Sequence, residues 1–189
     1  MKKKQYLITI LLVAFVMVLV LTQKFFDANF KQAALLDNNI SSMKEYVIEE
    51  EHYSYSLPET WQPMKKVSNS YKVYQAGFNS EEKDIMGYVE LLSTDEDVKA
   101  LAQKDIDNLS LKCSKEKVEN YSCKNYKGIK TEYKTKVDGG YSFINSNYYL
   151  KLSDNLVCKF AFTAKNKAYK DNMNAIYDVI VSSIKATDK

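Results

Sequence analysis

The segment CKNYKGIKTEYKTKV, residues 123–137, alternates between two kinds of side chain. Its odd positions include Cys123, Ile129 and Tyr133, whereas its even positions are mostly Lys or Glu. A period of two is the repeat of a β-strand, in which successive side chains point to opposite faces of a sheet. The segment therefore predicts a strand with one buried face and one face toward solvent.

The residues that follow predict a meander, in which strands are joined by tight turns. Asp138-Gly139-Gly140 is a hairpin signal, and the chain continues as a second strand over residues 141–152. Ser153-Asp154-Asn155 predicts another turn, followed by a third strand over residues 156–164. Earlier strand signals lie at residues 53–57, 71–74 and 87–92.

Two segments show the helical repeat instead. Thr94, followed by Asp95-Glu96-Asp97, is typical of a capping box, and the apolar stripe behind it predicts a helix to about Leu111. A stripe from Tyr169 to Ile184 predicts a terminal helix. Meander strands with helices packed on them indicate an α+β fold, an antiparallel sheet flanked by helices.

Two short motifs resemble a known family. Leu57-Pro58-Glu59-Thr60-Trp61 is similar to the -LP-x-x-W- motif of PsbP and Mog-type domains, and residues 180–185 resemble the -I-x-x-S-I- ending of that superfamily. The resemblance covers about residues 46–185 and implies an α/β/α sandwich, with Trp61 in the core or in a packed turn. The superfamily includes photosystem accessory proteins, a nuclear Ran-binding protein and bacterial envelope proteins. It has no common catalytic residues, so the resemblance implies no catalytic site.

The N-terminus predicts a membrane segment. After three lysines, residues 6–21 form an apolar run broken only by Thr9, and as a helix this run spans about 24 Å of a membrane core about 30 Å thick. A cleaved signal peptide is the alternative, although a small-x-small cleavage site is not evident. We expect a single-pass signal anchor in contact with membrane lipid, with the N-terminus cytoplasmic and the main domain extracytoplasmic.

This interpretation divides the chain into three parts. Residues 1–26 form the cytoplasmic tip and transmembrane anchor, residues 27–45 a polar, partly helical stalk, and residues 46–189 the PsbP-like domain. All 27 basic residues are lysines, and the frequent Asn, Tyr and Ile are typical of an AT-rich bacterial genome.

The net charge of +3 does not indicate a nucleic-acid partner. Four lysines lie in the first 24 residues, which contain no acid, and the other 23 are outnumbered by the 24 acids. The absence of Arg also excludes bidentate guanidinium contacts to phosphate or guanine.

The predicted outer face of residues 123–137 is the best candidate for a binding surface. Between Lys112 and Lys136 there are eight lysines and three glutamates. Outside a bacterial membrane, such a surface suits an envelope protein or an anionic polymer. The alternative is that these lysines only keep a strand soluble and block edge pairing. The candidate binding residues are Lys124, Tyr126, Lys130, Lys134 and Lys136.

The three cysteines lie after the anchor, where disulfides can persist. Cys113 and Cys123 bracket a ten-residue step and are the candidate disulfide. The alternatives are a disulfide between Cys123 and Cys158, or buried thiols at both positions. The spacings contain no close ligand pair, so we expect no zinc site.

Two clusters of acidic residues contain side chains of the kinds used in catalysis. His52 follows Glu49-Glu50-Glu51, a combination that could bind a metal or transfer a proton, but charges at a domain junction are usually solvated. Helix capping explains Asp95-Glu96-Asp97.

The sequence thus predicts a binding or accessory module without catalytic activity or cofactor. The alternatives are a structural subunit of a secretion or sporulation complex, or a metal-dependent enzyme using the acids near His52.

Overall fold

The computed structural model describes residues 2–64, 72–137 and 139–187. The chain forms two compact units, residues 1–41 and residues 42–189. We call the second of these the sheet unit. It begins four residues before the predicted boundary at Tyr46, because β1 (Met43–Ile48) starts within the segment expected to be a stalk.

The first unit consists mainly of α1 (Lys2–Asp37), a helix of 36 residues that also takes up much of the predicted stalk. Among the residues that the structure describes, no helix is long and apolar enough to cross a membrane. The predicted anchor at residues 6–21 falls partly outside those residues, because the side chains at positions 7, 20 and 21 are not described. The membrane anchor therefore stays a prediction.

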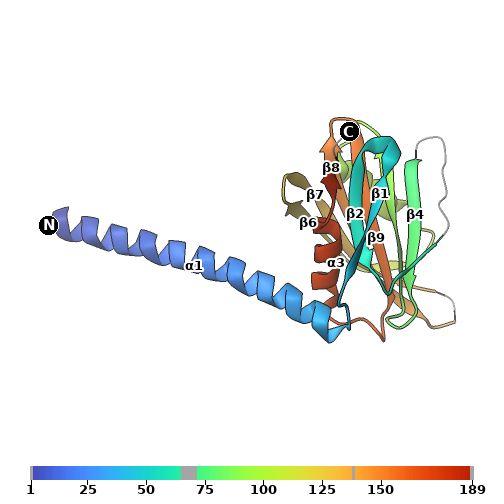
Figure 1. Ribbon diagram of the computed structural model, residues 1–189, viewed down its shortest axis with the longest axis horizontal. Coiled ribbons are helices and arrows are strands. Elements are labelled where there is room, and N and C mark those ends of the chain that lie inside the picture. The colour runs from blue at the N-terminus through green and yellow to red at the C-terminus, as the bar shows by residue number, and fades with distance from the viewer. Residues whose placement is uncertain (1, 65–71, 138, 188–189) are drawn as a thin grey trace. The chain divides into compact units, whose positions relative to one another are not determined.

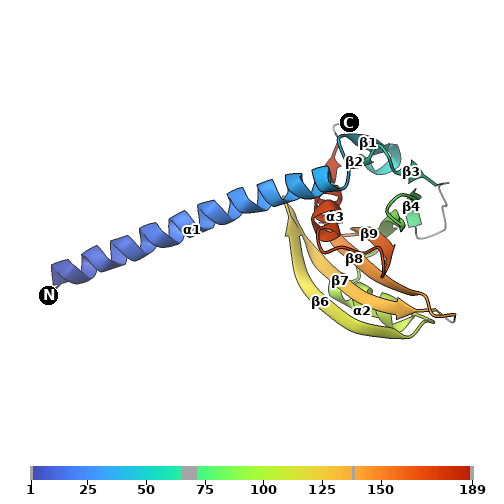
Figure 2. The same cartoon turned by 90° about the horizontal axis from the view of Figure 1, so that it is seen from below.

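The sheet unit is built on a seven-stranded antiparallel sheet with the order β3-β4-β5-β9-β8-β7-β6. Figure 2 shows β6 to β9 side by side in one curved sheet. The strands are β3 (Gln62–Pro63), β4 (Lys72–Ser80), β5 (Ile85–Ser93), β6 (Cys113–Cys123), β7 (Tyr126–Lys136), β8 (Ser142–Ser153) and β9 (Leu156–Lys165).

Two helices cover opposite faces of this sheet. The Tyr149 hydroxyl donates to Asp105 of α2 (Val98–Asp107) at 2.8 Å, and the hydroxyl of its neighbour Tyr148 donates to Asp178 of α3 (Met173–Ser182) at 3.3 Å. Because successive side chains of a strand point to opposite faces, α2 and α3 lie on opposite sides. We call these sides the α2 face and the α3 face.

A second, three-stranded sheet joins α3 on its side of the molecule. It has the order β1-β2-β10, with β2 (Tyr53–Pro58) between β1 and β10 (Lys185–Ala186). Tyr55 of β2 lies edge-on to Phe160 at 6.0 Å, and Phe160 is opposite Tyr148 in the register, so this sheet covers the α3 face (Figure 1). The predicted class, an antiparallel sheet flanked by helices, is confirmed, and the second sheet was not predicted.

Trp61 is buried, as the sequence predicted. Its side chain is 2% exposed and stacks on Phe78 with the ring centroids 5.3 Å apart. Its backbone N–H donates to the carbonyl of Pro58 at 2.9 Å, which closes the turn after β2. The motif around Trp61 therefore serves the packing of the core.

The strand predicted over residues 123–137 corresponds to β7, but it begins later than predicted, after a turn that joins it to a further strand, β6. β6 ends at Cys123, Lys124 adopts a positive φ of 48° in the turn, and β7 begins at Tyr126. The meander consequently has four strands rather than three. β6 was missed because it lies at the edge of the sheet and Cys123 alone is buried among its described side chains, so it shows no clear burial pattern.

The helix boundaries also differ from those predicted. Asp97, not Thr94, caps α2, because its carboxylate accepts hydrogen bonds from the backbone of Lys99 and Ala100. α2 ends at Asp107, before Leu111, and α3 begins only at Met173. The capping explanation for the acidic cluster holds, with a different residue as the cap.

Candidate functional site

The middle of the predicted binding face packs against α3 instead of facing solvent. The Lys130 ammonium lies 5.3 Å from the centre of the Tyr148 ring and donates to Asn174 Oδ1 of α3 at 3.3 Å. The Asn174 amide also donates to Glu132 at 3.3 Å and to the Tyr169 hydroxyl at 2.8 Å. Lys130 therefore helps to hold α3 on the sheet.

Acidic side chains alternate with the lysines on the same face of β6 and β7. Glu119 lies opposite Lys130, and Glu132 lies opposite Lys117. Lys117 also pairs with Glu119 on its own strand at 2.6 Å, and this contact raises the pKa of Lys117. The positive charge counted along the sequence is thus largely balanced over the middle of these strands.

The remaining predicted residues lie at the two ends of β7. Lys124 is exposed in the turn that precedes the strand, and Tyr126 is half-buried beside it, where burial raises the pKa of its hydroxyl. Lys134 and Lys136 lie at the other end. An eleven-residue strand is roughly 35 Å long. The five candidates therefore do not form one site.

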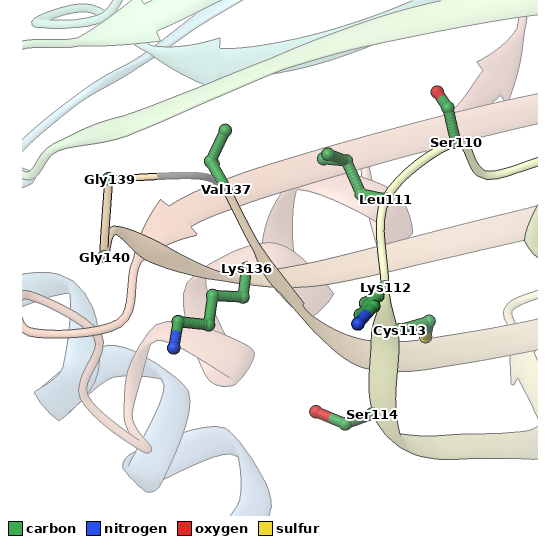
Figure 3. A pocket seen from close by; sticks show the side chains of 9 residues that line it. All are labelled: Ser110, Leu111, Lys112, Cys113, Ser114, Lys136, Val137, Gly139 and Gly140. Carbon is green, nitrogen blue, oxygen red and sulfur yellow. The ribbon is translucent and has the colours of Figure 1, made fainter.

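Lys134 and Lys136 belong to a different group, which the register of β6 and β7 brings together. Ser114 lies directly opposite Lys134, and Lys112 precedes β6. We call Lys112, Ser114, Lys134 and Lys136 the basic corner. Figure 3 shows the side chains of Lys112, Ser114 and Lys136 on one side of their two segments, whereas Leu111 and Val137 point away from them.

A cavity of about 810 Å³ opens beside the basic corner. It lies between the segment that enters β6 and the β7–β8 hairpin, and its lining includes Lys112, Ser114, Lys136 and Gly139-Gly140. No described residue that lines it is acidic, and Asp138 lies outside the described residues. A cavity lined by two lysines and two serines, with no acid among its described residues, favours an anion.

The lysines of the basic corner have no acidic partner among the described residues. Over the described residues, Lys112, Lys134 and Lys136 form no ion pair, whereas nine other lysines do. Their charges are thus available to a ligand.

A second cavity, of about 480 Å³, lies between α2 and the sheet and carries both signs of charge. Lys72 pairs with Glu90, and Lys104 pairs with Glu96 at 3.4 Å. Lys159 pairs with Asp105 at 2.7 Å. Each cation that lines this cavity has its own acid, and one of the three pairs, Lys159 with Asp105, joins α2 to the sheet.

The predicted disulfide between Cys113 and Cys123 is wrong. The two residues begin and end the same strand, β6, and are roughly 33 Å apart along it, whereas a disulfide needs Cα atoms within about 7 Å. The Cys158 thiol is also free, which leaves no bridge from Cys123 to Cys158. Burial, followed by the charge of Glu116, raises the pKa of Cys113, so its thiol stays protonated and is a poor nucleophile.

The acids near His52 do not converge on a site. Glu49–Glu51 form a single 3-10 turn, and His52 ends it with a φ of 56°. Within the described residues, which leave out the Glu50 side chain, no group of three or more His, Cys, Asp and Glu side chains could hold a metal ion. The enzyme alternative gains no support from this segment.

No protein-family model matches the sequence, and no curated protein sequence is significantly similar to it. Among solved structures, that of cyanobacterial PsbP (CyanoP) from Synechocystis sp. PCC 6803 is similar, with a TM-score of 0.56 and 13% identity over 78% of this chain and 94% of that one. LpqN, which is involved in cell envelope biogenesis of Mycobacterium tuberculosis, matches with a TM-score of 0.49 and 13% identity over 78% of this chain and 91% of that one.

The likeness to CyanoP concerns the fold. The chain shares the fold of CyanoP over 78% of its length, which is the fold implied by the resemblance of the Trp61 motif and of the terminal helix. At 13% identity, the shared fold assigns neither a ligand nor a partner to this chain.

Proposed function

We propose that this protein is a non-catalytic binding module, held at the outer surface of a bacterial cell membrane by α1, that docks an anionic envelope partner at the basic corner. The observation that carries the proposal is the acid-free lining, over the described residues, of the cavity beside Lys112 and Lys136. Neither lysine forms an ion pair with another described residue, so a ligand that brings negative charge would find its counter-ions already placed.

The anchor is supported by the side chains of α1. Ile10, Leu11, Leu12 and Val13 are four consecutive residues and are 66%, 68%, 57% and 55% exposed. Consecutive helical residues point about 100° apart, so these four surround the helix. A helix that is apolar on all sides needs apolar surroundings, and lipid provides them.

The basic corner is tested by reversing its charge. We expect the variant Lys112→Glu/Lys134→Glu/Lys136→Glu, as a full chain in zwitterionic nanodiscs, to lose at least about 100-fold in affinity for dextran sulfate. This figure counts about 1 kcal/mol for the lost attraction of each lysine near an anionic surface, and repulsion by the new glutamates adds to it. Binding is measured by titration at fixed ionic strength, with uncharged dextran as the blank.

The matched control changes the net charge by the same amount elsewhere. Lys99, Lys151 and Lys170 are exposed and lie outside the basic corner, so the variant Lys99→Glu/Lys151→Glu/Lys170→Glu should keep most of the affinity. Equal losses in the two triple variants would mean that total charge, not the basic corner, decides binding.

The anchor is tested separately by fractionation. The protein should stay in the membrane fraction through an alkaline carbonate wash. Mass spectrometry of the intact protein should show that its N-terminus has not been cleaved. Leu12→Arg/Val16→Arg should release it, because each charge in a membrane core costs about 2.5–3.5 kcal/mol.

Leu36→Arg is the matched control for this test. Leu36 is 65% exposed and lies in the same helix, beyond the apolar run, so its replacement should leave the chain in membranes. A shortened chain would indicate the cleaved signal peptide instead.

A structural subunit of an envelope complex is the second candidate. Met64 and Met86 are 54% and 57% exposed beside a cavity of about 340 Å³. Exposed apolar side chains of this kind favour contact with another protein. This role would be favoured if the triple variant of the basic corner bound dextran sulfate with the same affinity as the unchanged protein.

A further inference from the structure

The cavity of about 480 Å³ between α2 and the sheet is lined in part by charged side chains that are themselves buried. Glu90 and Lys159 are the two residues of this kind. The volume falls within the range of about 300–1,000 Å³ that small-molecule pockets usually have. The cavity shares no described lining residue with the cavity of the basic corner. It is therefore a candidate for a second, separate binding site.

Two features of the sheet bring these charges together. Glu90, Lys159 and Tyr149 lie opposite one another on three neighbouring strands, so their side chains share the α2 face. The register of β4 against β5 shifts by one residue between Lys72 and Tyr74. Such a shift moves the side chains beyond it to the other face of the sheet. Lys72 therefore lies on the α2 face, where it pairs with Glu90.

The cavity carries as many acids as lysines over the described residues. Its three lysines and three acids form three ion pairs. Residues 65–71, which precede Lys72 in the chain, lie outside the described residues. A ligand with a net charge would have to compete with an internal partner at each pair, whereas the lysines of the basic corner have no such partner. The cavity therefore favours an uncharged ligand.

Hydroxyl groups suit charges that are already paired. An ammonium has three donors and a carboxylate has about four acceptor positions, so one ion pair leaves most of this capacity unused. A hydroxyl both donates and accepts. It can therefore donate to the carboxylate, or accept from the ammonium, without separating the pair. A ligand that is rich in hydroxyls gains hydrogen bonds here and leaves the ion pairs intact.

Sugars match the outer part of the cavity in two respects. Neighbouring hydroxyls on a sugar ring are about as far apart as two hydrogen-bonded heavy atoms, and the ammonium of Lys104 lies 3.4 Å from the carboxylate of Glu96. Two adjacent hydroxyls can thus reach both members of this pair. Leu92 and Leu101 also line the cavity and are half-buried, so they offer apolar surface to the C–H face of a sugar ring.

We infer that the cavity between α2 and the sheet binds a short, uncharged oligosaccharide, whose hydroxyls bridge Lys104 and Glu96 and extend to Glu90. The side chains of Lys104 and Glu96 are 61% and 34% exposed, so a ligand reaches them without any opening of the fold. Glu90 lies deeper in the same cavity. This inference goes beyond the proposed function, because it adds a second site for a ligand of different charge.

The test uses the full chain in zwitterionic nanodiscs and a panel of uncharged trisaccharides. The panel consists of cellotriose, maltotriose, mannotriose and tri-N-acetylchitotriose, and the binding of each sugar is titrated by saturation-transfer NMR. At least one of these sugars should bind. Glycylglycine, a zwitterion that would compete for the paired charges directly, should not displace it.

Two cavity variants and a matched control locate the bound sugar. Glu96→Ala/Lys104→Ala removes the outer pair at constant net charge and should weaken binding about tenfold, the loss expected for two hydrogen bonds. Glu90→Gln keeps the size of the deeper side chain and should weaken binding about fivefold. Asp84→Ala/Lys165→Ala removes an exposed ion pair outside the cavity, also at constant net charge, and should leave binding unchanged.

Native fluorescence of Trp61 shows that each variant is folded. The inference is overturned if no sugar of the panel binds, if either cavity variant binds normally, or if the cavity variants and the control lose affinity equally. Displacement by glycylglycine would also overturn it, because the cavity would then take a zwitterion. None of these results affects the proposed function. The triple variant of the basic corner, which tests that function with dextran sulfate, should bind the sugar as the unchanged protein does.

Discussion

Replacing Phe162 with alanine is expected to lower the free energy of unfolding by about 3–5 kcal/mol, a large share of the stability of an ordinary domain. Phe162 lies on β9 and is 0% exposed. Its ring stacks on Tyr177 of α3 with the centroids 4.1 Å apart, and it also contacts Phe78 at 5.6 Å and Tyr148 at 6.0 Å. Truncation would leave a cavity where α3 meets the sheet.

Urea unfolding measures this effect, with the fluorescence of Trp61, the only tryptophan, as the probe. Tyr141→Ala is the control, because Tyr141 is also aromatic but is 67% exposed in the hairpin. Its replacement should change stability by less than about 0.5 kcal/mol. Similar losses in the two variants would contradict a core centred on Phe162.

The sequence predicted those parts of the fold that leave a burial pattern. The alternation around Ile129 and Tyr133 marked β7, and the motif ending at Trp61 marked the turn after β2. β6 left no such pattern, because an edge strand with few buried side chains can be hydrophilic on both faces. The disulfide between Cys113 and Cys123 was predicted for the same reason, since a strand was taken for a loop.

The candidate site could be predicted only in part. The number of lysines indicated the basic region, but a count along the sequence does not show which charges are balanced by acids on the neighbouring strand. The contacts of Asn174 with Lys130 and with Glu132 depend on where α3 packs, which the sequence does not show. Lys112 joins the basic corner because β6 pairs with β7. A sequence analysis that recognised β6 would have placed its first residues beside Lys134, but Ser114 lies opposite Lys134 only because the register shifts between Ser114 and Lys117.

Replacing Asp105 with alanine should cost about 2–3 kcal/mol. The side chain of Lys159 is only 10% exposed, and its ammonium lies 2.7 Å from Asp105 and 5.3 Å from the centres of the Tyr88 and Tyr149 rings. Burial alone would lower the pKa of Lys159, but Tyr88, Tyr149 and the Asp105 carboxylate outweigh it and raise this pKa. Without the carboxylate, a buried cation loses its counter-ion, and the Tyr149 hydroxyl loses its acceptor.

This cost is set below the 3–5 kcal/mol of a fully buried pair because the Asp105 side chain is 36% exposed and water can partly replace it. The decisive measurement is a double-mutant cycle by urea unfolding. Lys159→Met removes the cation and keeps most of the side-chain volume, so Asp105→Ala/Lys159→Met should be more stable than Asp105→Ala alone. Glu90, the cross-strand neighbour of Lys159, keeps Lys72 as its partner in this double variant. If the two losses simply add, the pair is uncoupled, and Asp105 holds α2 on the sheet through the Tyr149 hydroxyl rather than through Lys159.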